Sequence, residues 1–235
     1  DKFGGKKPLY VEKLLQEAKG VAELLRDNNK EIETLYIGGG TPTTLSPEEM
    51  ETLIKGLFKE FDLSNIKEFT VEAGRPDTIN REILEVLKKH GVSRISINPQ
   101  TMNDETLQKV GRKHSVNDII ECFQLARELG FDNINMDIIL GLVDENLAMV
   151  ENTLKEIEKL SPESLTVHTL AVKRTSKLKE NIDDYELTQF DEMTKMIDLS
   201  MKYAKKMGLN PYYMYRQKHM LGNLENIGYA KEGYE

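Results

Sequence analysis

The feature that most constrains the fold of this 235-residue chain is the regular alternation of helix-like and strand-like segments. One helix comes first, and five units of a strand followed by a helical region come after it. Such a pattern requires parallel strands joined by right-handed crossovers. The apolar spacing predicts helices over residues 8–28, 47–61, 80–90, 104–110, 116–129, 147–160 and 187–207, and strands over 34–37, 68–72, 93–97, 133–140 and 164–170.

We therefore expect an α/β fold with one barrel domain over residues 1–208 and a tail over 209–235 that is rich in Tyr and Gly. A βα barrel begins with a strand, whereas this pattern begins with a helix. The first strand is thus expected upstream of Asp1, and the lack of an initiator Met agrees with a fragment. The strand over 34–37 would then form an exposed edge.

Composition excludes several classes of protein. The net charge is −8 and the sequence pI is about 5.3, which argues against a general nucleic-acid surface. No run of eighteen apolar residues indicates a membrane span, and no signal peptide is visible, so we expect a cytoplasmic protein. Cys122 is the single cysteine and lies in a helical apolar pattern, which predicts a buried thiol. The four histidines show no metal-ligand spacing, and no metal site is predicted.

A glycine loop follows the strand over 34–37. The sequence Gly38-Gly39-Gly40-Thr41-Pro42 leaves backbone N–H groups open to a ligand, and Pro42 fixes the exit of the loop. Ser46-Pro47-Glu48-Glu49 then predicts a helix start with a capping box. The loop is neither a dinucleotide fingerprint nor a Walker A motif. A tight turn without a ligand is the plain alternative, but three successive glycines favour a ligand loop.

Polar residues follow the other strands at the same predicted edge. Glu72 follows the second strand and Gln100 the third, while Asp137 lies within the fourth and Arg112 lies in a loop beyond Gln100. In βα barrels such strand ends meet at one mouth. Glycine amides, carboxylates, an amide and an arginine suit a ligand with an amine, a carboxylate and a ribose. The alternative is that these residues are solvated loop positions.

The motifs together resemble the radical S-adenosylmethionine (radical SAM) superfamily and, within it, the oxygen-independent coproporphyrinogen III oxidase (dehydrogenase) family. The resemblance covers about residues 8–235, and the tail resembles the clostridial and bacillar branch. It is carried by YIGGGTPT at 36–43, VEA at 71–73, INPQTMNDETL at 97–107, VGR at 110–112 and MDIILGL at 136–142.

The resemblance implies a partial (β/α)6 barrel of parallel strands that lacks its first strand, and it implies roles for individual residues. Gly39, Gly40 and Thr41 match the loop that holds the amino group of S-adenosylmethionine. Other matched positions surround its ribose and carboxylate or line the cofactor: Glu72, Gln100, Arg112, Asp137, Ile139 and Ala171. No catalytic residue is assigned.

The family also has a cysteine triad that holds a [4Fe–4S] cluster, and this triad is absent here. We expect it just before Asp1, and the fragment itself is expected to bind no cluster and to be inactive. In the intact enzyme the resemblance implies that the reduced cluster cleaves S-adenosylmethionine. The resulting radical removes hydrogen from the propionates of coproporphyrinogen III, and decarboxylation gives vinyl groups. An electron donor is implied as a partner.

Two alternatives remain open. Relatives in this family are haem-binding chaperones, for which His168 or His219 would be candidate axial ligands. The other alternative is a phosphate-binding barrel enzyme that uses the glycine loop. For a tetrapyrrole with several propionates, cations near the mouth are required, and Arg174 and Arg216 are the candidates for gripping a carboxylate. The oligomeric state is not predicted.

Overall fold

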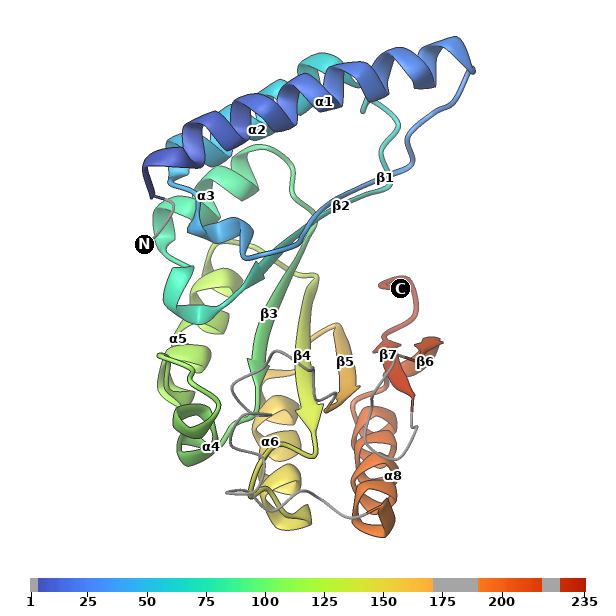
Figure 1. Cartoon of the computed structure of the whole chain (residues 1–235). Helices are drawn as coiled ribbons and strands as arrows, with labels where there is room; N and C mark the ends of the chain where they lie inside the picture. The colour runs from blue at the N-terminus through green and yellow to red at the C-terminus, as the bar shows by residue number, and fades with distance from the viewer. Residues whose placement is uncertain (1–3, 171–189, 217–224) are drawn as a thin grey trace. The chain divides into compact units, whose positions relative to one another are not determined.

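The computed structural model describes residues 4–170, 190–216 and 225–235 (Figure 1). The chain divides into two compact units. Unit 1 comprises Asp1–Ser96 and Leu125–Asp132, and unit 2 comprises Ile97–Gln124 and Asn133–Glu235. Strand β3 (Arg94–Gln100) and helix α5 (Val116–Glu128) each contribute residues to both units.

Unit 1 is built from helices that follow parallel strands. Its complete elements are α1 (Lys7–Asp27), β1 (Thr34–Ile37), α2 (Pro47–Glu60), β2 (Glu68–Gly74) and α3 (Arg81–Lys89). Short 3-10 turns at Gly4–Lys6, Pro42–Thr44 and Pro76–Thr78 precede or connect them. Strands β1 and β2 pair in parallel, with Ile37 opposite Val71. This pairing brings the glycine loop after β1 beside the end of β2.

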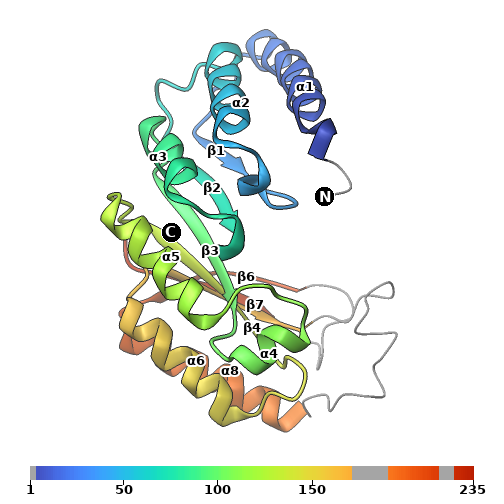
Figure 2. The ribbon, with the colours of Figure 1, turned by 90° about the vertical axis from the view of Figure 1, so that its left-hand side faces the viewer.

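Helices α1 and α2 lie side by side in unit 1 (Figure 2). Val11 and Ala18 of α1 are buried together with Leu53 and Leu57 of α2, and this cluster closes over one side of β1. The start of α2 is fixed by the capping box: Ser46 Oγ accepts from Glu49 N, and the Glu49 carboxylate accepts from Ser46 N. The predicted capping box is confirmed.

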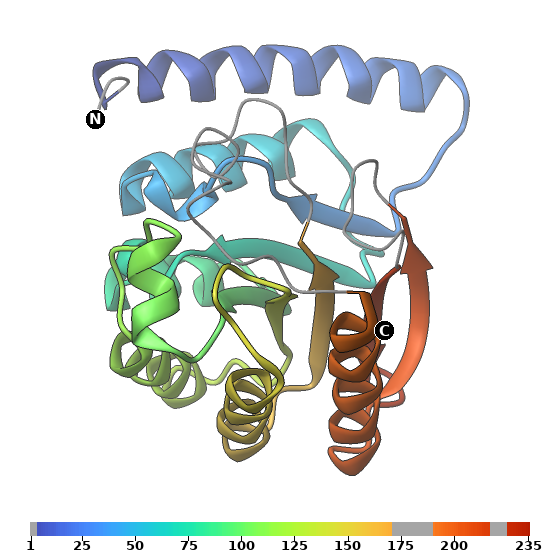
Figure 3. The same cartoon turned by 60° about the horizontal axis from the view of Figure 1, so that its bottom comes forward.

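Unit 2 contains a sheet with the strand order β4-β5-β7-β6. Its elements are α4 (Asp104–Lys109), β4 (Ile134–Leu140), α6 (Leu147–Leu160), β5 (Ser164–Thr169), α8 (Phe190–Lys206), β6 (Asn210–Tyr215) and β7 (Asn226–Ala230). Strands β4 and β5 are parallel, whereas β7 is antiparallel to both of its neighbours. Helices α6 (yellow) and α8 (orange) lie next to each other in this unit (Figure 3).

The two faces of this sheet differ in composition. Met136, Ile138 and Leu140 of β4 are at most 1% exposed. Side chains alternate between faces along a strand, so Asp137 and Ile139 lie on the opposite face, where both are half-buried. One face is therefore apolar core, and the other presents polar groups.

The predicted α/β class with mostly parallel strands is confirmed, and element bounds agree to within a few residues. Two differences stand out. Strand β3 continues three residues beyond the predicted end, through Gln100, and the tail forms strands β6 and β7. All but the last residue of β6 are exposed, so its sequence carries little apolar alternation, and pairing with β7 defines it. The domain boundary at 208 remains a prediction.

Candidate functional site

The glycine loop of unit 1 presents an open backbone surface. A Cβ atom added at Gly39 or Gly40 would meet no atom of the described residues within 4 Å, so none of these residues fills the space there. Gly39 has a φ of 106°, a backbone conformation that residues other than glycine rarely adopt. Gly38 differs, because a Cβ there would lie 2.2 Å from the Tyr36 ring. The Tyr36 ring therefore occupies the space that a side chain at Gly38 would take, whereas no described residue occupies the space beside Gly40.

Glu72 lies directly beside this loop. Its Oε2 accepts a hydrogen bond from Gly39 N at 3.3 Å. The loop is also fastened to β2 by Thr43, whose hydroxyl donates to Ala73 O at 2.6 Å and lies 2.7 Å from the Thr78 hydroxyl. These contacts hold the backbone of the loop in place and keep the Glu72 carboxylate beside it. An ammonium group would find an acceptor at Glu72.

A pocket of about 640 Å³ borders the loop within unit 1. Gly38, Gly40 and Thr41 form one wall, and Lys7 and Tyr10 from the start of α1 form another. Lys7 Nζ donates to Thr44 O at 2.6 Å and ties α1 to the loop. Of the predicted loop residues, Gly40 and Thr41 line this pocket, whereas Gly39 does not line it and is linked to Glu72 through its backbone N.

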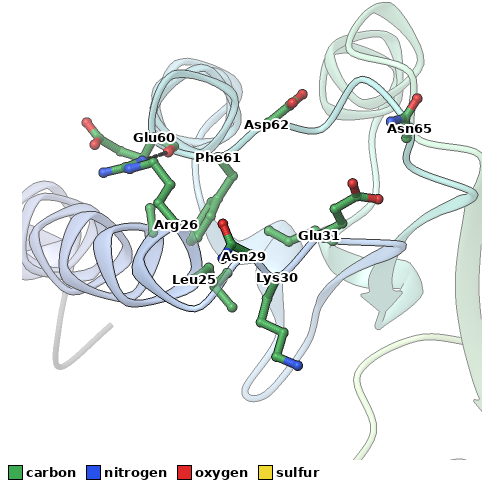
Figure 4. A pocket seen from close by; sticks show the side chains of 11 residues that line it. Leu25, Arg26, Asn29, Lys30, Glu31, Glu60, Phe61, Asp62 and Asn65 are labelled. Carbon is green, nitrogen blue, oxygen red and sulfur yellow. Dashed lines mark hydrogen bonds between the residues drawn. The ribbon is translucent and has the colours of Figure 1, made fainter.

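A second pocket of unit 1, of about 420 Å³, lies where the end of α1 meets the end of α2 (Figure 4). Arg26 donates to Glu60 O at 3.2 Å across it, and Glu31 and Asp62 also line it. None of the predicted site residues belongs to this pocket. We assign no function to it.

In unit 2, Gln100 ends strand β3 in a left-handed conformation with a φ of 69°. A non-glycine residue rarely adopts this conformation, which costs about 1–3 kcal/mol unless the surroundings impose it. The Gln100 side chain is 8% exposed, and its Nε2 lies 3.4 Å from Asn98 O. Such backbone strain is common at ligand sites.

A buried carboxylate, Glu145, supports the residues just after Gln100. Glu145 is 5% exposed and its Oε1 accepts from Thr101 Oγ1 at 2.5 Å and from Asn103 Nδ2 at 3.0 Å. Thr153 of α6 accepts from Met102 N at 3.0 Å. Burial raises the pKa of Glu145 above its ordinary value, and the hydrogen bonds from neighbouring side chains only partly oppose this. This network holds the chain after β3 to α6.

Asp137 of β4 is oriented by its neighbours. Asn135 Nδ2 donates to Asp137 Oδ1 at 2.6 Å, and Asn135 Oδ1 accepts from Thr166 Oγ1 at 3.1 Å. His168 Nε2 lies 3.6 Å from Asp137 Oδ2. Ile139 stands opposite His168 in the register of β4 and β5. Unit 2 thus brings the predicted residues Asp137 and Ile139 to one sheet face.

The other predicted residues are more scattered. Arg112 is half-buried just after α4, where its backbone N donates to Leu107 O at 2.8 Å. Arg216 is exposed and forms an ion pair with Glu225. Ala171, Arg174 and His219 lie outside the described residues. All of these assignments remain predictions.

Cys122 is 7% exposed, and burial raises the pKa of its thiol to about 12, so the predicted buried thiol is confirmed. A thiol of this kind is a poor metal ligand, because ligation requires the thiolate. Within the described residues no three His, Cys, Asp or Glu side chains group together as a metal site would require. Helices long and apolar enough to cross a membrane are likewise not found in the described part.

Comparison with known proteins identifies the class. The family model "Radical SAM superfamily" matches residues 3–157. The chain belongs to the radical SAM superfamily. Similar proteins include ones named as oxygen-independent coproporphyrinogen-III oxidase-like and as haem chaperones.

The chain is 47% identical over 220 residues to the oxygen-independent coproporphyrinogen-III oxidase-like protein HemZ of Bacillus subtilis, covering 93% of this chain and 44% of HemZ. It is 36% identical over 164 residues to the haem chaperone HemW of the same organism, covering 69% of this chain and 42% of HemW. The chain therefore spans less than half the length of these relatives.

The structure of the coproporphyrinogen III oxidase HemN from Escherichia coli superposes with a TM-score of 0.80 at 24% identity, covering 97% of this chain and 49% of that one. The archaeal Elp3 of Methanocaldococcus infernus matches with a TM-score of 0.63 at 18% identity, covering 79% of this chain and 49% of that one. These likenesses show the fold, a mixed α/β half-barrel with mostly parallel strands.

The residues present fit S-adenosylmethionine, the cofactor that the superfamily implies. In unit 1, the open space beside the Gly40 backbone and the Glu72 carboxylate suit the amino acid portion of this cofactor. Considered separately, unit 2 offers the Asp137 carboxylate as an acceptor for a hydroxyl or amino group. The residues present do not fit a [4Fe–4S] cluster, since cysteine thiolates normally hold such clusters and the single cysteine is buried on α5.

Sequence reasoning missed two groups of side chains. Glu145 was not singled out, although a carboxylate four residues after Gly141 at a strand end is a detectable signal. Tyr213 and Tyr215 were seen only as part of a Tyr-rich tail. Their two-residue spacing would have placed them on one face of a strand, had a strand been predicted there.

Proposed function

We propose that the full-length protein catalyses the oxygen-independent oxidative decarboxylation of coproporphyrinogen III to protoporphyrinogen IX. The observation that carries this proposal is the 47% identity to an oxygen-independent coproporphyrinogen-III oxidase-like protein across 93% of the chain. The open glycine loop beside Glu72 supports a role in binding S-adenosylmethionine. We further propose a cytoplasmic location and an electron-donating partner.

Bound S-adenosylmethionine supplies the radical chemistry that removes a hydrogen atom from the substrate. The chain's own residues bind and orient it. The backbone of Gly39 and Gly40 with Thr41 would receive the amino group, and Glu72 would accept a hydrogen bond from that ammonium. Gln100 and Arg112 would contact ribose and carboxylate, and Asp137, Ile139 and Ala171 would line the rest of the cofactor.

Substrate binding requires local positive charge, because a tetrapyrrole with four propionates approaches a chain of net charge −8. Arg174 and Arg216 are our candidates. Arg216 pairs with Glu225, and a substrate carboxylate would replace that partner. A guanidinium can hold a carboxylate with two parallel hydrogen bonds.

A haem chaperone is the second candidate. It is supported by the similarity to HemW and by His168, whose side chain is 25% exposed on the polar face of unit 2. A phosphate-binding barrel enzyme, the third reading of the sequence, gains no support from these relatives. The two functions can be distinguished by measuring haem binding and the consumption of coproporphyrinogen III.

The test uses the full-length protein, purified anaerobically with its cluster. The oxidase proposal expects coproporphyrinogen III to be consumed with release of CO2 and formation of 5′-deoxyadenosine. The chaperone expects stoichiometric haem binding, seen as a Soret band, without turnover. Haem binding combined with no consumption of coproporphyrinogen III would reject the oxidase proposal.

A further inference from the structure

The polar face of unit 2 extends from Asp137 to the C-terminal strands. In the sheet register, Asp137 stands opposite Thr166, Thr166 opposite Gly228, and Gly228 opposite Tyr213. These four positions form one row across β4, β5, β7 and β6. The row begins at a residue proposed to line the cofactor and ends at an aromatic ring.

The Tyr213 ring lies over strand β7 at Gly228. A Cβ atom added at Gly228 would lie only 2.0 Å from Tyr213 Cε1, so the ring occupies the space that a side chain would take. Its hydroxyl reaches the side chain of Thr166 on β5, two strands away. Gly228 has no positive φ, so close approach of the ring explains the glycine there.

The Tyr215 side chain, two residues after Tyr213 on β6, also crosses β7 toward β5. Its hydroxyl lies 3.2 Å from His168 Nδ1, and His168 Nε2 faces Asp137 Oδ2 at 3.6 Å. The Tyr213 and Tyr215 rings are stacked, with an interplanar angle of 12° and centroids 5.9 Å apart. Both rings are therefore fixed at their hydroxyl ends to β5, next to the face that carries Asp137 and Ile139.

We propose that Tyr213 and Tyr215 form an aromatic floor that binds a pyrrole ring of the substrate beside the cofactor. This inference rests on the proposed function, which supplies a tetrapyrrole as the substrate. Tyr213 is 38% exposed although its hydroxyl end is anchored, so part of a rigid ring faces outward. Aromatic rings attract one another at centroid separations of about 4.5–7 Å, and two anchored rings lose little freedom on binding.

Continuity with the proposed cofactor site favours a substrate over another occupant. Hydrogen abstraction requires the substrate carbon to lie next to the cofactor. The row that carries Tyr213 begins at Asp137, which is proposed to line the cofactor, so a substrate on the Tyr213 ring would lie beside that site. Burial raises the pKa of the Tyr213 phenol above its ordinary value, which favours the protonated hydroxyl. The floor contributes binding and orientation, and Tyr213 is a substrate-binding residue in this proposal.

The experiment measures two quantities in the full-length, cluster-containing protein: KM for coproporphyrinogen III, and the dissociation constant of coproporphyrin III from fluorescence quenching. Gly228→Ala places a methyl group under the Tyr213 ring and displaces it. Tyr213→Ala removes the ring, and Tyr213→Phe keeps the ring without the hydroxyl. Met214→Ala is the matched control, because Met214 is 67% exposed and stands opposite Ile227 on the other face of β6.

We expect Gly228→Ala and Tyr213→Ala each to raise both KM and the dissociation constant about tenfold. Tyr213→Phe should raise them no more than about threefold. The double variant Gly228→Ala/Tyr213→Ala should equal Tyr213→Ala, because the ring that the methyl group displaces is gone. Affinity for S-adenosylmethionine and thermal stability should change little, and Met214→Ala should behave as wild type. Should Gly228→Ala not fold, the contrast between Tyr213→Ala and Tyr213→Phe tests the same point.

The two proposals fail differently. A wild-type protein that turns over coproporphyrinogen III, with KM unchanged in Tyr213→Ala, keeps the proposed function and overturns the aromatic floor. A wild-type protein without turnover, whose binding of coproporphyrin III still depends on the Tyr213 ring, keeps the floor and overturns the oxidase. Equal losses in Tyr213→Phe and Tyr213→Ala would also overturn the floor, since the ring would then contribute nothing.

Discussion

Two strand ends of this protein, the glycine loop after β1 and the turn after β3, use a left-handed residue in different ways. At the first, Gly39 has a φ of 106° and no side chain. At the second, Gln100 has a φ of 69° and a buried side chain. In the proposed cofactor site the first strand end would offer a ligand its backbone, for which glycine suffices. The second would offer the Gln100 side chain, and the Glu145 network holds the residues that directly follow the strained backbone.

The largest expected effect concerns the open backbone. Gly40→Val should weaken binding of S-adenosylmethionine to the full-length protein by at least about a hundredfold, since the side chain fills the space that the ligand needs. The fold should tolerate it, because a Cβ there meets nothing within 4 Å. Calorimetry measures the affinity, and Gly20→Ala in α1 serves as the control. Unchanged affinity in Gly40→Val would show that the loop does not contact the cofactor.

Loss of the hydrogen bonds around Glu145 should lower the stability of the protein. Glu145→Ala leaves the donors of Thr101 and Asn103 without their acceptor in a buried site, which should lower the free energy of unfolding by about 2–4 kcal/mol. Glu145→Gln keeps an acceptor oxygen and should lose less. Urea unfolding of the three proteins makes the comparison. Equal losses of stability in Glu145→Ala and Glu145→Gln would contradict a stabilising role for the carboxylate's hydrogen bonds.

The same carboxyl group makes a prediction about pH. Its pKa is raised in the folded state, so its contribution to stability is present below the ordinary value of 4.5 and is lost as pH rises through the folded-state pKa. The free energy of unfolding of wild type relative to Glu145→Gln should therefore fall with rising pH. A difference that rises with pH would contradict the assigned direction.

A smaller effect is expected at the proposed substrate cations. Arg216→Ala removes a charge-assisted carboxylate contact worth about 1.5–3 kcal/mol and should raise KM for coproporphyrinogen III about ten- to a hundredfold. Cleavage of S-adenosylmethionine should remain largely intact. Arg174→Ala is tested in parallel, and Glu225→Ala separates loss of the ion pair from loss of the cation. If neither arginine variant changes KM, these cations do not bind substrate.

The smallest effect sharpens the comparison of the two strand ends. Gln100→Gly relieves the left-handed backbone and should change the free energy of unfolding by no more than about 1 kcal/mol, while affinity for S-adenosylmethionine falls. Asn29→Gly is the matched control, because Asn29 has a φ of 51° at the exposed end of α1. The control should gain stability without changing affinity. A Gln100→Gly variant with unchanged affinity would remove Gln100 from the site.

Much of the fold could be predicted because the signals were local. The capping box at Ser46 and the buried thiol of Cys122 both follow from neighbouring residues in the sequence. The glycine loop could be found for the same reason, since three glycines between a strand and a helix form a contiguous pattern. The family resemblance rested on such contiguous motifs and was confirmed.

What the sequence by itself determined were these local elements, their order and the residues that follow each strand. Only the tertiary structure decided that Tyr213 crosses Gly228 to reach Thr166, and that Glu145 holds Thr101 from 44 residues away. These contacts depend on strand register and on side chains brought together across the sheet. Local propensity carries no information on register, because a shift of one residue would reverse every side chain of a strand while leaving its sequence unchanged.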